Sequence, residues 1–148
     1  MKEKLKIAVI NGPNLNLLGK REPHIYGSET FEDFFIRLKN EFPEADLTYF
    51  QSNHEGELID FIHKIGFTFD GIVINAGAYT HTSIAIADAL SAVKTETVEV
   101  HISNVYARED FRKINHIAPR VKGSIIGLGL TGYRLAVQYF CDKQNFKG

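Results

Sequence analysis

The chain has 148 residues, and its 17 basic and 18 acidic side chains give a formal net charge of −1, a length and balance typical of one globular domain. The near-zero charge excludes an overall field that would attract nucleic acid or an anionic membrane, so we expect neither partner. A single cysteine excludes an internal disulfide framework, and the N-terminal apolar run is too short for a signal peptide or a membrane span, so we expect a cytoplasmic protein.

Strand-like and helix-like segments alternate along the chain. Short apolar runs bounded by turn residues predict strands, and apolar side chains at helical spacing predict helices. In chain order the predicted elements are strand 7–10, helix 30–42, strand 47–50, helix 58–65, strand 71–74, helix 83–93, strand 97–102, strand 124–126 and helix 130–141. Capping boxes of Thr30 with Asp33 and of Ser52 with Glu55 predict two helix starts, and Gly66 lies where a helix should end.

This alternation predicts an α/β fold. Strands separated by helices favour βαβ units and a parallel sheet that is covered on both faces. Right-handed crossovers in a doubly wound five-stranded sheet commonly give the order 2-1-3-4-5, the flavodoxin-like arrangement. We expect residues 1–148 to form a single domain of this kind.

The segment 11–28 is far longer than the few residues that usually join a strand to the next helix. It contains Gly19 and Gly27 as possible hinges, together with Arg21 and Tyr26. A long loop that carries hinges and reactive side chains is a candidate lid. Because a neighbouring guanidinium favours the ionised form of a phenol, Tyr26 beside Arg21 is a candidate base. The alternative is an exposed loop tyrosine that packs over apolar surface.

Polar side chains gather where three neighbouring strands of the expected sheet end. In open α/β sheets the ligand site lies beyond the carboxyl ends of the strands, at the point where the strand order reverses. The side chains expected to meet there are Asn11, Asn14, Arg21, Tyr26, Asn75, His81, Glu99, His101, Ser103, Asn104, Arg108 and Arg112. Loops are polar in most proteins, so the prediction depends on the convergence of all three clusters.

Glu99 and His101 form the most informative local motif. They are two residues apart, so both side chains point to the same face of a strand. A carboxylate in a central strand is costly to bury unless it is paired, and a carboxylate that orients a histidine makes it a better proton carrier. The alternative is a satisfied structural pair near the strand end.

Other motifs predict neither a metal nor a cofactor. Gly127 to Gly132 match the spacing G-x-G-x-x-G, but no ribose-binding acid follows at the expected distance, so we interpret them as a tight turn with close helix–sheet packing. The histidines lack the spacing of a metal motif. No lysine stands at a predicted strand end, which disfavours an imine mechanism.

The chain closely resembles the type II 3-dehydroquinate dehydratases of the shikimate pathway. The resemblance runs from about Lys6 to Phe140 and rests on separate motifs that agree in order and spacing. These motifs are Asn11-Gly12-Pro13-Asn14-Leu15-Asn16-Leu17-Leu18-Gly19, Arg21-Glu22-Pro23, Tyr26-Gly27, Asn75-Ala76-Gly77-Ala78-Tyr79-Thr80-His81-Thr82-Ser83, Glu99-Val100-His101-Ile102-Ser103-Asn104 and Gly127-Leu128-Gly129 with Gly132-Tyr133.

The resemblance implies an anti elimination of water from 3-dehydroquinate through an enolate, which gives 3-dehydroshikimate without any cofactor. It implies that Tyr26 is the base and that Arg21 holds it ionised. Asn14 would stabilise the enolate oxygen. His101, supported by Glu99, would protonate the departing hydroxyl.

The resemblance also implies how substrate is held and how the chain assembles. The implied substrate-binding groups are the backbone N–H groups of Ile102 and Ser103 for the carboxylate, and the side chains of Asn75, His81 and Arg112 for the ring hydroxyls. Asp88 would reach the active site of an adjacent subunit in a homododecamer, a tetramer of trimers.

Two other readings stay open: a flavin- or nucleotide-dependent enzyme on the same fold, and a non-enzymatic binding module. The lack of an acidic cluster after the first strand disfavours a receiver-like module. The sequence does not distinguish a biosynthetic from a quinate-catabolic role. It also leaves two roles for Arg108, a second pocket charge or a structural partner of Glu109 or Asp110, of which the structural role is preferred.

Overall fold

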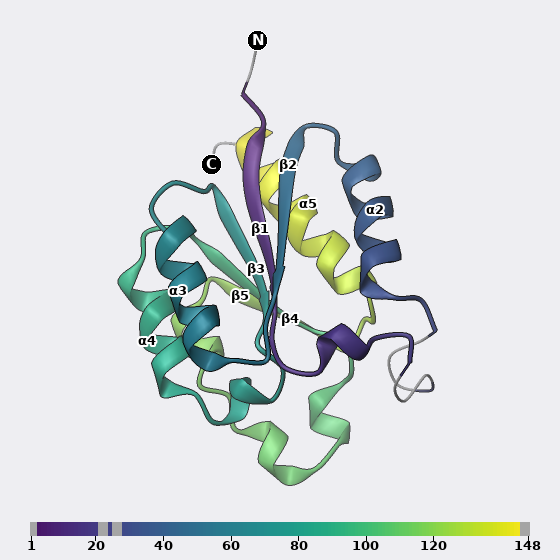
Figure 1. Cartoon of the computed structure of the whole chain (residues 1–148), viewed down its shortest axis with the longest axis vertical. Helices are drawn as coiled ribbons and strands as arrows, with labels where there is room; N and C mark the ends of the chain where they lie inside the picture. Colours follow the sequence, from purple (N-terminus) through teal and green to yellow (C-terminus); the bar gives the residue numbers. More distant parts are fainter. Residues whose placement is uncertain (1–2, 21–23, 25–27, 146–148) are drawn as a thin grey trace.

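The computed structural model describes residues 3–20, 24 and 28–145. Its centre is a parallel five-stranded sheet with the order β2-β1-β3-β4-β5, which confirms the predicted order (Figure 1). The strands are β1 (Leu5–Asn11), β2 (Ala45–Gln51), β3 (Gly71–Asn75), β4 (Thr97–His101) and β5 (Gly123–Ile126). The predicted strands therefore lie within two residues of the observed bounds.

Helices cover both faces of the sheet (Figure 1). Helices α2 (Phe31–Glu41) and α5 (Thr131–Asn145) lie on one face, and α3 (Glu55–Ile65) and α4 (Ile84–Ala92) lie on the other. An apolar cluster of buried side chains lies on each face of the sheet. Side chains of β1 alternate between these two clusters, because successive strand residues point to opposite faces. Burial on both faces explains why residues 7–10 form an unbroken apolar run.

One of the two predicted capping boxes is wrong. Thr30 does cap α2, and its side chain accepts a hydrogen bond from the backbone N–H of Asp33 at 3.2 Å. Helix α3 instead begins at Glu55 behind His54. Ser52 lies two residues before this cap, and its hydroxyl accepts the backbone N–H of His54 at 2.9 Å in a local turn before the helix.

The glycines after β5 make a tight turn and a close contact, as predicted. Gly127 and Gly129 have left-handed backbone angles, with φ of 88° and 63°. A Cβ on Gly132 would lie 3.0 Å from Cγ1 of Val100, so α5 can approach the sheet closely only without a side chain there. Gly66 follows the last residue of α3, also as predicted.

No helix in the described part of the chain has the length and apolar character needed to cross a membrane. Beyond the carboxyl end of β4, residues 105–120 form three short 3-10 turns, light green at the bottom of Figure 1. These turns and the loops after β1 and β3 surround the carboxyl ends of the central strands.

Candidate active site

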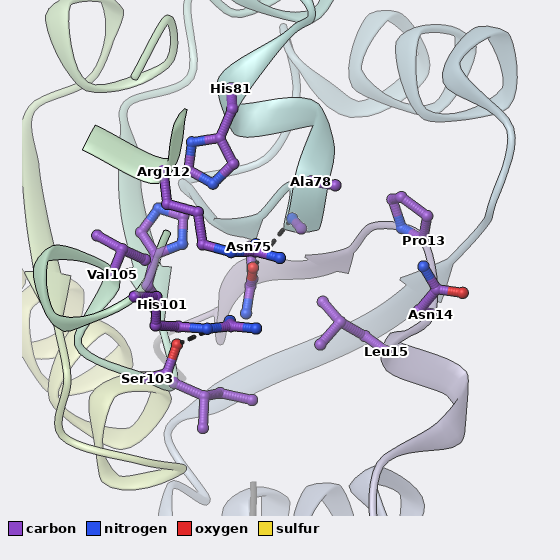
Figure 2. Close-up of a pocket in the computed structure, with 13 residues that line it drawn as sticks. Pro13, Asn14, Leu15, Asn75, Ala78, His81, His101, Ser103, Val105 and Arg112 are labelled. Atoms are coloured by element: carbon purple, nitrogen blue, oxygen red, sulfur yellow. Dashed lines mark hydrogen bonds between the residues drawn. The ribbon is translucent and has the colours of Figure 1, made fainter. Parts of the chain in front are cut away.

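A pocket opens where β1, β3 and β4 end, and Figure 2 shows side chains from all three segments converging on it. Its cavity volume is about 100 Å³. The lining residues are Pro13, Asn14, Leu15, Asn75, Gly77, Ala78, His81, His101, Ile102, Ser103, Val105, Arg108 and Arg112. The strand order reverses beside β1, so the pocket lies at the switch point where ligands bind in open α/β sheets.

Glu99 and His101 are paired beneath this pocket, as their spacing predicted. Oε2 of Glu99 lies 2.8 Å from Nε2 of His101, and the two residues are only 1% and 5% exposed. Burial by itself disfavours the carboxylate, but hydrogen bonds from His101, Ser124 and Asn115 outweigh it and lower the pKa of Glu99. The ionised carboxylate accepts a hydrogen bond from the N–H at Nε2 of His101. Nδ1 is therefore the ring nitrogen that Glu99 does not contact.

Two residues that the sequence did not predict complete the environment of Glu99. The hydroxyl of Ser124 donates to Oε1 at 2.6 Å, and the amide of Asn115 donates to Oε1 and Oε2 at 3.2 and 3.0 Å. The oxygen of the Asn115 amide accepts the backbone N–H groups of Ile117 and Ala118, both at 2.8 Å. Because backbone N–H groups only donate, the Asn115 amide cannot reverse, and its NH2 group must face the carboxylate.

His81 presents an acceptor to the pocket. Its Nδ1 lies 2.7 Å from the carbonyl oxygen of Ile114, which can only accept, so Nδ1 carries the proton of the neutral ring. Burial lowers the pKa of His81 below the ordinary 6.5, and the positive charge of Arg112 lowers it further. The ring is therefore neutral at pH 7, with Nε2 as an acceptor.

Two arginines bring positive charge to the pocket wall. Nε of Arg112 donates to Glu109 at 2.9 Å, and its guanidinium lies 4.9 Å from the ring centre of Phe111. In Figure 2 the Arg112 side chain extends across the pocket toward Asn75. Arg108 donates to the hydroxyl of Ser103 at 3.2 Å and lies 3.7 Å from Glu109. Arg108 thus lines the pocket and also lies beside Glu109.

Asn14 lies across the pocket from His101 (Figure 2). Its backbone is left-handed, with φ of 71°, and its N–H donates to the side-chain oxygen of Asn53 at 3.0 Å. Asparagine tolerates this conformation better than most residues. The contact with Asn53, which follows β2, fixes the start of the long loop against the sheet.

Arg21 and Tyr26 lie outside the described residues, but the ends of their loop are described. Gly19 has φ of 89°, and a Cβ there would lie 2.8 Å from the carbonyl oxygen of Ser28. The carboxylate of Glu29, the next residue, accepts two hydrogen bonds of 2.9 and 2.7 Å from the guanidinium of Arg37 on α2. Gly19 and Ser28, the described residues on either side of this loop, therefore lie side by side.

Three described candidates neither line the pocket nor support His101: Asn11, Asn104 and Asp88. Asp88 lies on α4 with 64% of its side chain exposed, and it pairs with Arg120 at 3.0 Å. The other described candidates, including Ile102 and Ser103, line the pocket or support His101. Among residues 3–20, 24 and 28–145, no group of three or more His, Cys, Asp or Glu side chains is placed to hold a metal ion.

Comparison with known proteins adds an independent result. The family model described as "Dehydroquinase class II" matches residues 5–141. The 3-dehydroquinate dehydratase of Bacillus licheniformis is 50% identical over 94% of this chain and 97% of its own length, and that of Gloeothece citriformis is 56% identical over 91% and 90%. The crystal structure of type II dehydroquinase from Butyrivibrio crossotus superposes with a TM-score of 0.89 at 48% identity, covering 95% of this chain and 99% of the other.

Proposed function

The chain belongs to the class II dehydroquinase family, and from this premise we propose how its pocket removes water from 3-dehydroquinate. The activity is that of a 3-dehydroquinate dehydratase, a hydro-lyase of the shikimate pathway. The observation that carries the proposed mechanism is the buried pair of Glu99 and His101, which opens onto a pocket with amides, a neutral imidazole and arginines.

The proposed first step is removal of a proton from the carbon next to the ketone by the phenolate of Tyr26. Arg21 keeps the phenol ionised, since it is always protonated and lies on the same loop. The common anchor of the loop ends at Gly19 and Ser28 supports a lid that closes over the pocket without disturbing the sheet.

Asn14 and His101 act on the two oxygens that change in the reaction. Asn14 stabilises the enolate oxygen, an interaction of the type that often contributes several kcal/mol to a transition state. The protonated ring of His101, whose positive charge the carboxylate of Glu99 stabilises, then gives its Nδ1 proton to the departing hydroxyl, which leaves as water and leaves the ring neutral. The elimination is proposed to be anti, so the base and His101 would act on opposite faces of the substrate ring.

The rest of the pocket is proposed to hold the ground-state substrate. The backbone N–H groups of Ile102 and Ser103 bind the carboxylate, as converging amides do for anions. The loop that carries them is fixed from behind, because the carbonyl of Ile102 accepts the N–H of Gly129 at 3.0 Å. Asn75, Arg112 as a donor and neutral His81 as an acceptor bind the ring hydroxyls, and no cofactor or metal has a role in these steps.

We further propose that residues 1–148 act as a single catalytic domain in the cytoplasm and assemble as a homododecamer, a tetramer of trimers. Asp88 supports this assembly, because it is exposed and does not line the pocket of its own chain. Phe111 and Ile114, on either side of Arg112, are 52% and 56% exposed and would be covered by a neighbouring subunit. Sedimentation velocity that found only monomers at assay concentrations would contradict the assembly.

The experiment that tests the proposed function is an assay of enone formation from 3-dehydroquinate by the wild type and by Tyr26→Phe. The variant should fold and bind substrate but lose nearly all turnover, because phenylalanine cannot accept a proton. Tyr106→Phe, which changes an exposed tyrosine of a 3-10 turn, is the control and should keep full activity. A wild type that forms no enone would refute the function, and substantial kcat in Tyr26→Phe would refute Tyr26 as the base.

A further inference from the structure

Asn75, labelled among the pocket-lining residues in Figure 2, has its side-chain amide held in one orientation by hydrogen bonds. Its oxygen accepts the backbone N–H of Gly77 at 3.1 Å, and its nitrogen donates to the hydroxyl of Tyr133 at 2.9 Å. A backbone N–H can only donate, so a reversed amide would place two donors against each other. One N–H of the Asn75 amide remains for the pocket.

The hydroxyl of Tyr133 accepts a hydrogen bond from Asn75, because it donates its own proton to another residue. Its hydroxyl donates to the side-chain oxygen of Asn11 at 2.7 Å, and the Asn11 amide in turn lies 3.4 Å from the hydroxyl of Tyr49. Burial raises the pKa of Tyr133, so the phenol keeps its single proton. With that proton directed to Asn11, only a lone pair can face Asn75.

The three residues of this relay come from three elements and are fixed in place. Asn11 and Asn75 are register partners at the ends of β1 and β3, and Tyr133 reaches both from the first turn of α5. The Tyr133 ring is fully buried, with ring centres 4.9 Å from Phe31 and 6.0 Å from Phe34. Neither Asn11 nor Tyr133 lines the pocket.

We propose that Tyr133, together with Asn11, is a positioning residue that aims the free N–H of the Asn75 amide at a ring hydroxyl of the substrate. This inference rests on the proposed function, in which Asn75 binds that hydroxyl. Preorganised polar groups bind more tightly because less freedom is lost on binding. The relay therefore contributes to substrate affinity from behind the wall, without touching the substrate.

Tyr133→Phe tests the proposal, because it keeps the buried ring and removes only the hydroxyl. The Asn75 amide then lacks its acceptor, and KM should rise about three- to tenfold, the effect of one hydrogen bond. The kcat should stay within about twofold, since the same contact is made in the ground state and in the transition state. Tyr139→Phe is the matched control, because it removes a hydroxyl on the same helix that donates to Glu96 at 2.7 Å, away from the pocket.

A double variant separates positioning from a general structural role. In an Asn75→Ala background, Tyr133→Phe should change KM by less than about twofold, because the group that it positions is gone. A structural role would give the same factor in both backgrounds. If Tyr133→Phe does not fold, Asn11→Ala takes its place: the Tyr133 proton would turn to Asn75 and compete with Gly77 for the amide oxygen, which should also raise KM.

Active wild type with an unchanged KM in Tyr133→Phe, or in Asn11→Ala where that variant replaces it, overturns the inference. An equal KM factor in the Asn75→Ala background overturns it as well. Wild type that does not dehydrate 3-dehydroquinate overturns the proposed function and this inference with it.

Discussion

Replacing Glu99 by glutamine tests whether His101 depends on a neighbouring charge. The change keeps the side-chain size but removes the carboxylate that lies 2.8 Å from Nε2 of His101. A hydrogen bond to a charged group contributes about 1.5–3 kcal/mol, and each 1.36 kcal/mol corresponds to about tenfold in rate. The new amide also meets the NH2 group of Asn115, which cannot turn because Ile117 and Ala118 hold its oxygen. We therefore expect kcat to fall about 10- to 150-fold.

The assay is the initial rate of enone formation over a range of 3-dehydroquinate concentrations, with a thermal melt to confirm folding. KM should change little, since Glu99 is buried and does not line the pocket. Glu96→Gln is the matched control: Glu96 immediately precedes β4, at the end of the sheet away from the pocket, where it pairs with Tyr139 and Lys143. A folded Glu99→Gln enzyme with more than about half of the wild-type kcat would refute the role of the charge.

Two further predictions concern stability. Gly132→Ala should lower the free energy of unfolding by about 1–3 kcal/mol, because the new Cβ would lie 3.0 Å from Val100. Gly56→Ala in α3 should raise the free energy of unfolding by about 0.5–1 kcal/mol, because the new Cβ would lie in open space. Equal effects in urea unfolding would contradict this reasoning. The pKa of His81 is lowered from 6.5 in the folded protein. As the pH falls below about 6.5, the His81 side chain therefore takes up a proton in the unfolded chain before it does so in the folded protein, and the free energy of unfolding decreases. The unfolding free energy should therefore drop less between about pH 8 and about pH 5.5 in His81→Gln than in wild type, and identical drops would disprove it.

The sheet could be predicted from sequence because its central strands are covered on both faces. That coverage leaves unbroken apolar runs at residues 7–10 and 71–74. The pairing of Glu99 with His101 was also predictable, because a spacing of two places both side chains on one face of a strand. Local patterns of this kind hold the information that the fold and the Glu99–His101 pair require.

The environment of that pair could not be predicted in the same way. Ser124 reaches Glu99 because the two residues are register partners on β5 and β4, and register depends on the whole sheet. Asn115 reaches the same carboxylate from a loop between 3-10 turns, whose path no periodicity encodes. The mistaken capping box at Ser52 has a similar origin, since its hydroxyl had a nearer backbone donor.

Gly19 and Ser28 lie in contact, so residues 20–27 are bounded by two neighbouring points of the fold. A loop with neighbouring ends can be lengthened or exchanged for that of a relative at an entropic cost that grows only with the logarithm of its length. Under the proposed mechanism, this loop holds the group that removes a proton and the sheet holds the group that gives one. A graft at these two junctions would therefore replace one half of the acid–base chemistry and leave the other half unchanged.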